Sequence, residues 1–298
     1  MRGMNGRVWQ ETFMLHAADG AALHVSLALP AAGESESVVC IVHGIGEHGG
    51  RYAVVAEALT GRGAAVFALD HRGHGRSQGK RGHASVRNMT DDAVLLLLAA
   101  SARFPGRPLF LYGHSMGGNV ALSCALRHRP AIDGLILSSP WLRLAFNPPW
   151  WKLAIGRLIG RLLPSMTMST GLDSGALYRN GEQSRRDSYD ELMHTRVSSE
   201  LFFSIMDEGC RSVAEAGALN VPTLILHGTE DRVTSFAASR ETAERAGQRC
   251  EFVAWEGGYH ELHHDREAER VLAFIGEWVR ARSGRGDCCE QPDSTESG

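Results

Sequence analysis

Short apolar runs without polar alternation recur along most of the chain, and segments with helical periodicity separate them. A strand that is apolar on both sides is typical of a parallel sheet covered by helices on both faces. The alternation predicts an α/β domain with a mostly parallel sheet and helices on both faces. The predicted strands are residues 38–42, 64–69, 109–112, 135–137, 223–226 and 251–253, and the predicted helices are residues 53–60, 91–103, 119–128, 235–246 and 267–280. Before them, residues 11–16 and 23–29 flank the turn Ala17-Ala18-Asp19-Gly20 and predict an antiparallel hairpin.

The alternation stops between residues 141 and 216, where the pattern contains no buried strand. This stretch is interpreted as an all-helical cap over the carboxyl ends of the strands, where such sheets bind ligands. The predicted organisation is a core of residues 1–140 and 217–281, a cap of residues 141–216 and a disordered tail of residues 282–298.

One cap segment, residues 150–163, has a strong helical pattern with an apolar face. Its apolar face carries Trp151, Ile155, Leu158 and Leu162, and the residues that fall away from it are Lys152, Arg157 and Arg161. We predict that the cap contacts substrate through Trp150, Trp151, Ile155 and Leu158. Simple packing of this face on the core is one alternative. The paired tryptophans and basic residues favour another, a lipid or membrane surface.

Composition narrows the class of protein. The chain has 298 residues, 43% of them hydrophobic and 22% charged, which indicates a globular protein. A net charge of −3 excludes nucleic-acid binding driven by bulk charge. Residues 1–10 lack the apolar core of a secretory signal, so we expect a cytoplasmic protein, membrane-peripheral if the cap touches lipid. Six cysteines without Cys-x-x-Cys spacing indicate free thiols, and the role of Cys288-Cys289 in the tail stays open.

A Gly-x-Ser-x-Gly pattern occurs twice, and its surroundings distinguish the two copies. Gly113-His114-Ser115-Met116-Gly117 follows a predicted strand and precedes a predicted helix, as in a nucleophile elbow. The copy around Ser77 lies in a basic, glycine-rich segment with no strand directly before it. We therefore predict that Ser115 is the nucleophile.

A serine nucleophile needs a base, an acid that orients the base, and donors for an oxyanion. The acid candidates Glu230 and Asp231 follow the strand at 223–226, and the base candidates His260, His263 and His264 follow the strand that starts at 251. With Asp265, the three histidines also have a loose ligand-like spacing. Nothing else in the chain completes such a set, and no metal site is predicted.

The oxyanion donors are predicted to be two backbone amides. Glycines around Ile45 in His43-Gly44-Ile45-Gly46 let the backbone approach a substrate carbonyl, and the amide of Met116 opens a helix next to Ser115. The glycine-rich loop lacks the spacing of a nucleotide-binding motif, so no cofactor is expected.

Together these motifs resemble the monoacylglycerol lipase and lysophospholipase family of α/β-hydrolases, over about residues 38–280. The matching segments are His43-Gly44-Ile45-Gly46-Glu47-His48 with Arg51-Tyr52, Asp70-His71-Arg72-Gly73-His74-Gly75-Arg76-Ser77, Gly113 to Gly118, Ser139-Pro140, His227 to Asp231 and Tyr259 to His263. The resemblance implies an α/β-hydrolase fold with an eight-stranded, mostly parallel sheet and a helical cap inserted after the sixth strand. It implies Ser115 as nucleophile, Asp231 as acid and His260 as base, with the Ile45 and Met116 amides as oxyanion donors.

The implied activity is hydrolysis of carboxylic esters of single-chain lipids, monoacylglycerols or lysophospholipids, through an acyl-enzyme. The expected partners are a small lipid ester and, transiently, a membrane surface through the cap, with no nucleic acid. A short-chain carboxylesterase or aminopeptidase-like hydrolase is the alternative within this fold, and a catalytically silent binding protein is the alternative outside it.

Overall fold

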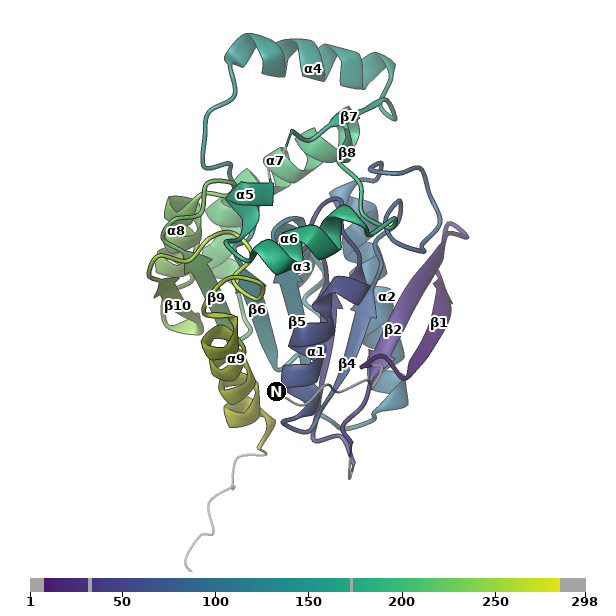
Figure 1. Cartoon of the computed structure of the whole chain (residues 1–298), viewed down its shortest axis with the longest axis vertical. Coiled ribbons are helices and arrows are strands. Elements are labelled where there is room, and N and C mark those ends of the chain that lie inside the picture. Colours follow the sequence, from purple (N-terminus) through teal and green to yellow (C-terminus); the bar gives the residue numbers. More distant parts are fainter. Residues whose placement is uncertain (1–7, 32–33, 172–173, 285–298) are drawn as a thin grey trace, which may run out of the picture.

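An eight-stranded sheet runs through the centre of the molecule (Figure 1). The computed structural model describes residues 8–31, 34–171 and 174–284. The strands of the sheet are β1 (Glu11–His16), β2 (Ala22–Ala28), β3 (Ser37–Val42), β4 (Ala64–Leu69), β5 (Leu109–His114), β6 (Gly134–Ser138), β9 (Thr223–Gly228) and β10 (Cys250–Trp255). Their spatial order is β1-β2-β4-β3-β5-β6-β9-β10. From β4 to β10 all neighbours are parallel, and the hairpin β1-β2 adds antiparallel strands at one edge.

Helices cover both faces of this sheet, as the doubly apolar strands predict. The helices around the sheet are α1 (Ala53–Thr60), α2 (Val86–Arg103), α3 (Met116–His128), α7 (Ser199–Glu215), α8 (Phe236–Ala246) and α9 (Ala268–Ser283). Buried side chains of α1 and α9 form one apolar cluster with the sheet, and those of α2, α3, α7 and α8 form the other. The predicted fold class, a mostly parallel sheet with helices on both faces, is confirmed.

Two helices extend beyond the residues that the sequence pattern predicts, α2 at its start and α9 at its end. α2 begins at Val86 rather than residue 91, because the Ser85 side chain accepts a hydrogen bond from the Asn88 amide. α9 continues to Ser283, so helix occupies the first residues assigned to the tail, and residues 285–298 lie outside the described part.

The segment of residues 150–198, between β6 and β9, stands over the carboxyl ends of the strands (Figure 1). It contains α4 (Trp150–Leu162), β7 (Thr167–Ser169), α5 (Ser174–Leu177), α6 (Gly181–Ser188) and β8 (Arg196–Ser198). The expectation of an all-helical cap is wrong, because β7 and β8 pair as an antiparallel ladder. Strands of three residues are too short to produce a recognisable alternation in the sequence.

The predicted cap range also contains a helix that packs on the core. α7 buries Leu201, Ile205 and Val213 in the same apolar cluster as α3. Asn119 of α3 ties this helix down, since its Nδ2 donates to the carbonyls of Ile205, at 2.9 Å, and Trp141, at 2.8 Å. The domain boundaries at residues 141 and 216 stay a prediction. The segment that stands away from the sheet ends before α7.

Across the described ranges, no helix combines the length and apolarity needed to cross a bilayer.

Replacing Asn119 with alanine should destabilise the junction between core and cap. The change removes the side-chain donor that joins the Trp141 carbonyl to α7, which costs about 1–3 kcal/mol in the free energy of unfolding. Urea denaturation measures this loss. The matched change Asn88→Ala, at a half-buried position in the first turn of α2, should cost less than about 0.5 kcal/mol. Equal losses for the two variants would contradict the bridging role.

Candidate active site

A sharp turn at the carboxyl end of β5 carries Ser115. The serine has φ 53° and ψ −118°, a left-handed conformation that costs energy for a residue with a side chain. Its surroundings require glycine: a Cβ on Gly117 would lie 2.1 Å from the Val42 carbonyl oxygen, and one on Gly113 would lie 2.3 Å from the Gly117 oxygen. The turn therefore lifts Ser115 above the sheet at the start of α3.

Ser115, His260 and Asp231 form a continuous hydrogen-bonded chain. His260 Nδ1 lies 2.7 Å from Asp231 Oδ2, and His260 Nε2 lies 3.0 Å from Ser115 Oγ. A carboxylate only accepts, so Nδ1 carries the proton and Nε2 accepts from the serine hydroxyl. These contacts bring together residues that lie 145 and 29 positions apart in sequence. Such an arrangement can remove a proton from Ser115 when its oxygen attacks a carbonyl.

Neighbouring charges favour the protonation states that Asp231 and His260 need for catalysis. Burial alone would raise the pKa of Asp231, but the positive charge that His260 can carry and a hydrogen bond from His227 hold that pKa well below its usual value. Burial alone would lower the pKa of His260, but Asp231, with Glu261 and Glu47, raises that pKa above 6.5. The site thus favours an ionised aspartate and an imidazole that takes up protons readily.

The aspartate is fixed by contacts that the sequence did not reveal. Asp231 Oδ1 accepts from the amides of Val233, at 2.7 Å, and Thr234, at 3.0 Å. His227 Nε2 lies 3.1 Å from Asp231 Oδ2, and its Nδ1 lies 2.8 Å from Ser239 Oγ. The position of His227, four residues before Asp231 at the end of a strand, was the only available signal of this role.

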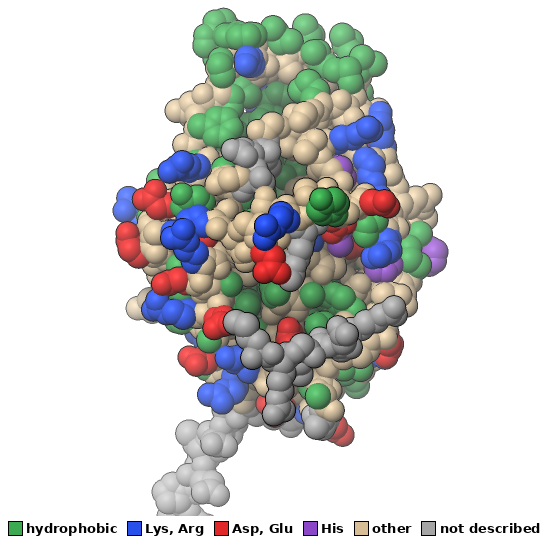
Figure 2. All heavy atoms as spheres, viewed as in Figure 1, with side chains coloured by type: hydrophobic (Ala, Val, Ile, Leu, Met, Phe, Trp, Pro, Cys, Tyr) green, Lys and Arg blue, Asp and Glu red, His purple; other side chains and the backbone are tan. Residues whose placement is uncertain are grey.

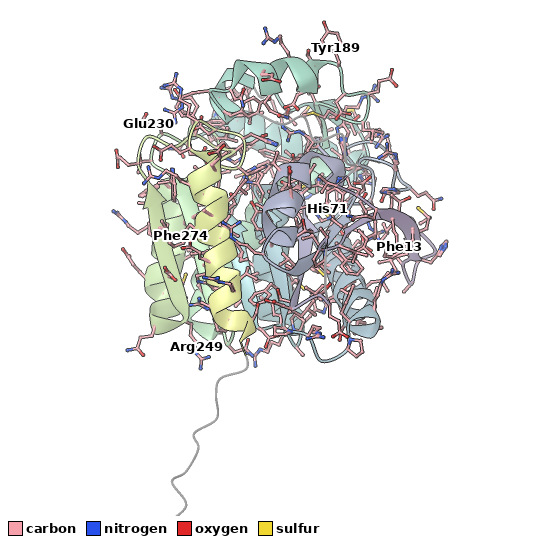
Figure 3. The ribbon with its side chains drawn as sticks, turned by 60° about the horizontal axis from the view of Figure 1, so that its bottom comes forward. Phe13, His71, Tyr189, Glu230, Arg249 and Phe274 are labelled. Carbon is pink, nitrogen blue, oxygen red and sulfur yellow. The ribbon has the colours of Figure 1, made fainter. Side chains whose placement is uncertain are left out.

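The rival residues lie elsewhere. Glu230 is exposed at the surface of the molecule (Figure 3). Ser77 is buried and has a structural role, since its hydroxyl accepts from the His24 amide at 2.8 Å and donates to the Asp70 carbonyl. His263 stacks on Tyr52 with a ring separation of 5.0 Å.

One cluster in the described part of the chain has metal-like geometry, formed by Glu261, His263 and His264. The carboxylate of this cluster, that of Glu261, already binds the Arg51 guanidinium, with Nη2 at 2.9 Å from Oε2. A cation already bound to that carboxylate disfavours a second one. His264 Nδ1 also lies 2.8 Å from Glu261 Oε2, so the cluster is explained as a buried ion-pair network.

The loop after β3 lies directly against Ser115. A Cβ on Gly44 would lie 3.3 Å from the Ser115 Cβ, and the Gly44 amide donates to Glu47 Oε1 at 2.5 Å. Tyr52 donates to the same oxygen at 2.8 Å, while Arg51 pairs with the other carboxylate oxygen. Ile45 itself lines a pocket that also contains Ser115. The loop is thus held beside the serine from the core side.

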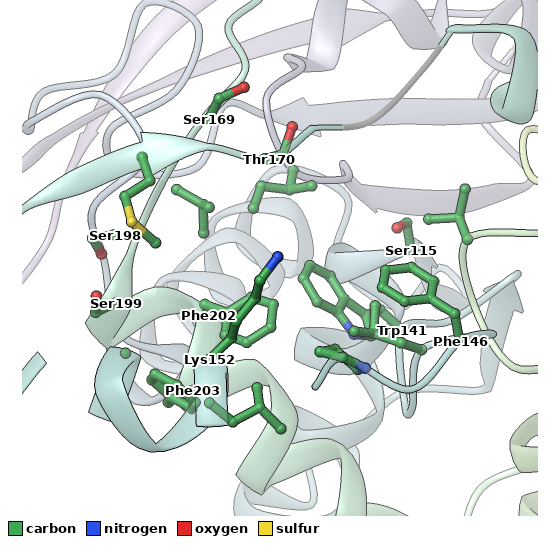
Figure 4. A pocket seen from close by; sticks show the side chains of 18 residues that line it. Ser115, Trp141, Phe146, Lys152, Ser169, Thr170, Ser198, Ser199, Phe202 and Phe203 are labelled. Atoms are coloured by element: carbon green, nitrogen blue, oxygen red, sulfur yellow. The ribbon is translucent and has the colours of Figure 1, made fainter. Parts of the chain in front are cut away.

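This pocket, a cavity of about 260 Å³, extends from Ser115 under the cap (Figure 4). Ser115 lies at one end near Trp141 and Phe146, and Ser198, Ser199 and Phe203 lie at the other. Most of the lining is apolar or aromatic, and Lys152 is the only charged residue among the described residues that line it. A mostly apolar cavity that reaches a reactive hydroxyl suits a hydrocarbon chain.

The cap residues predicted to contact substrate are not in this lining. Trp150, Trp151, Ile155 and Leu158 are 79%, 50%, 51% and 59% exposed, on the outer side of α4. The helix packs inward through its small residues: a Cβ on Gly156 would lie 3.2 Å from the Phe203 ring, and one on Gly160 would lie 3.1 Å from the Ser199 Cβ. Lys152, Leu153 and Gly156 line the cavity instead. The prediction oriented the helix wrongly, because an apolar face normally turns inward.

A mostly parallel sheet with a serine elbow and an acid and histidine on later strand ends defines an α/β-hydrolase. A family model described as serine aminopeptidase, S33, matches residues 33–267. A monoacylglycerol lipase of Mycolicibacterium smegmatis is 30% identical over 249 residues, which cover 83% of this chain and 89% of that protein. The crystal structure of Paleococcus ferrophilus monoacylglycerol lipase has a TM-score of 0.79 and 33% identity, covering 87% of this chain and 99% of that one.

An uncharacterised abhydrolase domain-containing protein of Dictyostelium discoideum is 32% identical over 252 residues, which cover 83% of this chain. The match spans 26% of that longer protein. The chain belongs to the monoacylglycerol lipase and lysophospholipase family of α/β-hydrolases, as its motifs indicated, and is a carboxylic ester hydrolase.

The raised pKa of His260 predicts a specific pH profile. His260 accepts a proton only when neutral, so kcat/KM for a soluble ester should fall as the pH drops through a value above 6.5. Asp231→Asn removes the largest influence that raises this pKa. It should move the acid limb to lower pH and reduce kcat by about 10⁴-fold.

The neighbouring change Glu230→Gln is the matched control for this profile. Because Glu230 is exposed and does not contact His260, its profile should overlay that of the unmodified enzyme. A shift with Glu230→Gln and none with Asp231→Asn would show that the wrong carboxylate has been assigned to the histidine.

Proposed function

We propose that the chain hydrolyses carboxylic esters of single-chain lipids, monoacylglycerols or lysophospholipids, through an acyl-enzyme on Ser115. His260 takes the Ser115 proton as Oγ attacks the ester carbonyl, and Asp231 holds the imidazole tautomer. The amides of Ile45 and Met116 stabilise the oxyanion. His260 then gives the proton to the leaving alcohol, and a water molecule, deprotonated by the same imidazole, releases the fatty acid and restores Ser115.

The observation that carries this proposal is the position of Ser115. Its hydroxyl is hydrogen-bonded to a histidine with a fixed tautomer, and it lies at one end of a mostly apolar cavity. The cavity accommodates one alkyl chain beside the ester. Burial of each methylene contributes about 0.8 kcal/mol, so the acyl chain supplies most of the binding energy. The restriction to single-chain lipids follows the relatives, which include monoacylglycerol lipases.

A second candidate is an aminopeptidase-like activity, because the matching family model carries that description. An aminopeptidase holds the charged amino group of its substrate, and a carboxylate is the usual partner for such a group. No aspartate or glutamate occurs among the described residues that line the cavity. The lining therefore favours a lipid ester over a peptide.

We further propose that the outer face of α4 contacts the membrane that supplies the substrate. Trp150, Leu158 and Leu162 are 79%, 59% and 74% exposed, and α4 has no buried residue. Figure 2 shows these apolar side chains gathered at the cap end of the molecule. An exposed apolar face of this kind is costly in water and is typical of a surface that meets lipid or a partner.

Substrate preference should follow chain length. For p-nitrophenyl esters and for monoacylglycerols, kcat/KM should rise from butanoyl to dodecanoyl chains, by up to about fourfold per methylene while the cavity still accepts it. An aminoacyl p-nitroanilide should be a poor substrate. Faster cleavage of short esters or of the anilide would contradict the lipid assignment.

The serine variants are the controls for this assay. Ser115→Ala should lower kcat by on the order of 10⁶-fold, and Ser77→Ala should retain hydrolysis because its hydroxyl supports only the loop around Asp70. Near-normal turnover by Ser115→Ala would refute the mechanism. Labelling with a fluorophosphonate probe, followed by mass spectrometry, identifies the reactive serine directly.

Membrane contact should depend on the paired tryptophans. The double change Trp150→Ala with Trp151→Ala should weaken binding to vesicles of phosphatidylcholine and phosphatidylglycerol at least about tenfold in a sedimentation assay. Tyr189→Ala is the matched control, because Tyr189 is an aromatic residue of the cap that is 86% exposed and lies away from α4. Equal binding by all three proteins would contradict a lipid-facing α4.

A further inference from the structure

The loop that carries Ile45 is held from the cap side as well as from the core. The His194 amide donates to the Gly46 carbonyl at 2.8 Å. Gly46 has φ 77°, and a Cβ there would lie 2.2 Å from the His194 carbonyl oxygen, so the two backbones touch. The cap turn formed by residues 187–194 thus packs directly on the residue after Ile45.

Asp190 organises this turn. Its Oδ1 accepts from the Leu192 amide at 3.0 Å, and its carbonyl accepts from the Met193 amide at 3.1 Å. Its own amide donates to the carbonyl of Asp187 at 3.2 Å. The turn delivers the next amide, that of His194, to Gly46. The carboxylate of Asp190 therefore determines where the cap meets the loop.

The same carboxylate holds the other end of the loop. Asp190 Oδ2 lies 2.8 Å from His48 Nε2, and His48 Nδ1 accepts from the Gly50 amide at 3.1 Å. Since Nδ1 is an acceptor, Nε2 carries the proton and donates it to Asp190. The imidazole of His48 is thus a bridge between the cap carboxylate and the loop backbone, with each nitrogen in a defined role.

A second cap carboxylate supports this arrangement. Asp187 Oδ2 lies 2.6 Å from Arg51 Nη2, and the same guanidinium contacts Glu47 and Glu261. Arg51 is only 3% exposed in its side chain, so these ion pairs are poorly screened. Glu47 in turn accepts from the Gly44 amide. Contacts from the cap therefore reach residues on both sides of Ile45.

We infer that Asp190 is a positioning residue for the oxyanion hole: it fixes the cap turn 187–194 against Gly46 and His48 and so aims the Ile45 amide at the developing oxyanion. The inference rests on the proposed function of Ser115 and Ile45. An amide displaced by a fraction of an ångström stabilises an oxyanion less well, while substrate binding depends mainly on the acyl cavity. Asp190 does not line that cavity. Its loss should consequently appear in kcat rather than in KM.

The test uses the full chain and p-nitrophenyl butyrate, with active sites counted by fluorophosphonate titration. Asp190→Ala, which removes both contacts, should lower kcat per active site about tenfold and change KM less than twofold. A trifluoromethyl ketone, whose adduct with Ser115 carries an oxyanion, should bind about tenfold more weakly. Asp190→Asn keeps an oxygen for the Leu192 amide but loses the His48 contact, so an intermediate loss of about threefold is expected.

Asp207→Ala is the matched control. Asp207 is also a carboxylate within the range 141–216. It pairs with Arg157 of α4 and makes no contact with the loop that carries Ile45 among the described contacts. This variant should retain kcat, KM and ketone affinity. An unchanged kcat for both Asp190 variants, a loss confined to KM, or an equal loss in Asp207→Ala would overturn the inference.

The failure of this inference can be distinguished from failure of the proposed function. Inactive Ser115→Ala together with normal Asp190→Ala would overturn only the role of Asp190. Active Ser115→Ala would overturn the mechanism on which that role depends. If Asp190→Ala does not fold, as judged by thermal unfolding, Asp190→Asn supplies the same comparison, and its normal kcat would count against the inference.

Discussion

The close approach of the α3 start to the end of β3 is the constraint on which the site depends. Gly117 leaves no room for a Cβ against the Val42 carbonyl, and this contact forces the chain through the left-handed turn at Ser115. A turn of this kind costs on the order of 1–3 kcal/mol, and the packed sheet beneath it supplies the stability that retains it. The same contact places the loop after β3 beside the serine. One backbone approach therefore positions both the reactive hydroxyl and the amide of Ile45.

Around this turn the protein gathers an excess of buried negative charge. Arg51 is the one guanidinium shared by Glu47, Glu261 and Asp187, and His260 lies next to Asp231. Burial opposes ionisation, but Arg51 keeps the pKa values of Glu47 and Glu261 below their usual range. Burial lowers the pKa of His260, but Asp231 raises it most, and Glu261 and Glu47 add to that rise. The network thus has two roles. It holds the cap against the core, and it changes the basicity of His260.

The cap shows how small residues can decide the orientation of a helix. α4 approaches α7 through Gly156 and Gly160, so its backbone comes close to Phe203 and Ser199. Close approach on that side turns the large apolar side chains outward, where Figure 2 shows them. This leaves the inner face to line the cavity and the outer face exposed. The face expected to contact substrate points outward, and Lys152, Leu153 and Gly156 line the cavity in its place.

The sequence by itself determined the layered α/β fold, most element positions and the family, because doubly buried strands and a glycine-flanked serine leave patterns within a few consecutive residues. Ser115 was recognisable for the same reason, directly after a strand. The choice of Asp231 over Glu230 and of His260 over its neighbouring histidines came from the resemblance to the family. What only the tertiary structure decided is how distant segments meet. Packing between separate elements decided four features. These are the contact of His227 with Asp231, the pairing of β7 with β8, the outward face of α4 and the contact of Asp190 with His48. Such contacts have no local periodicity, since their partners are chosen by the folded backbone rather than by neighbouring residues.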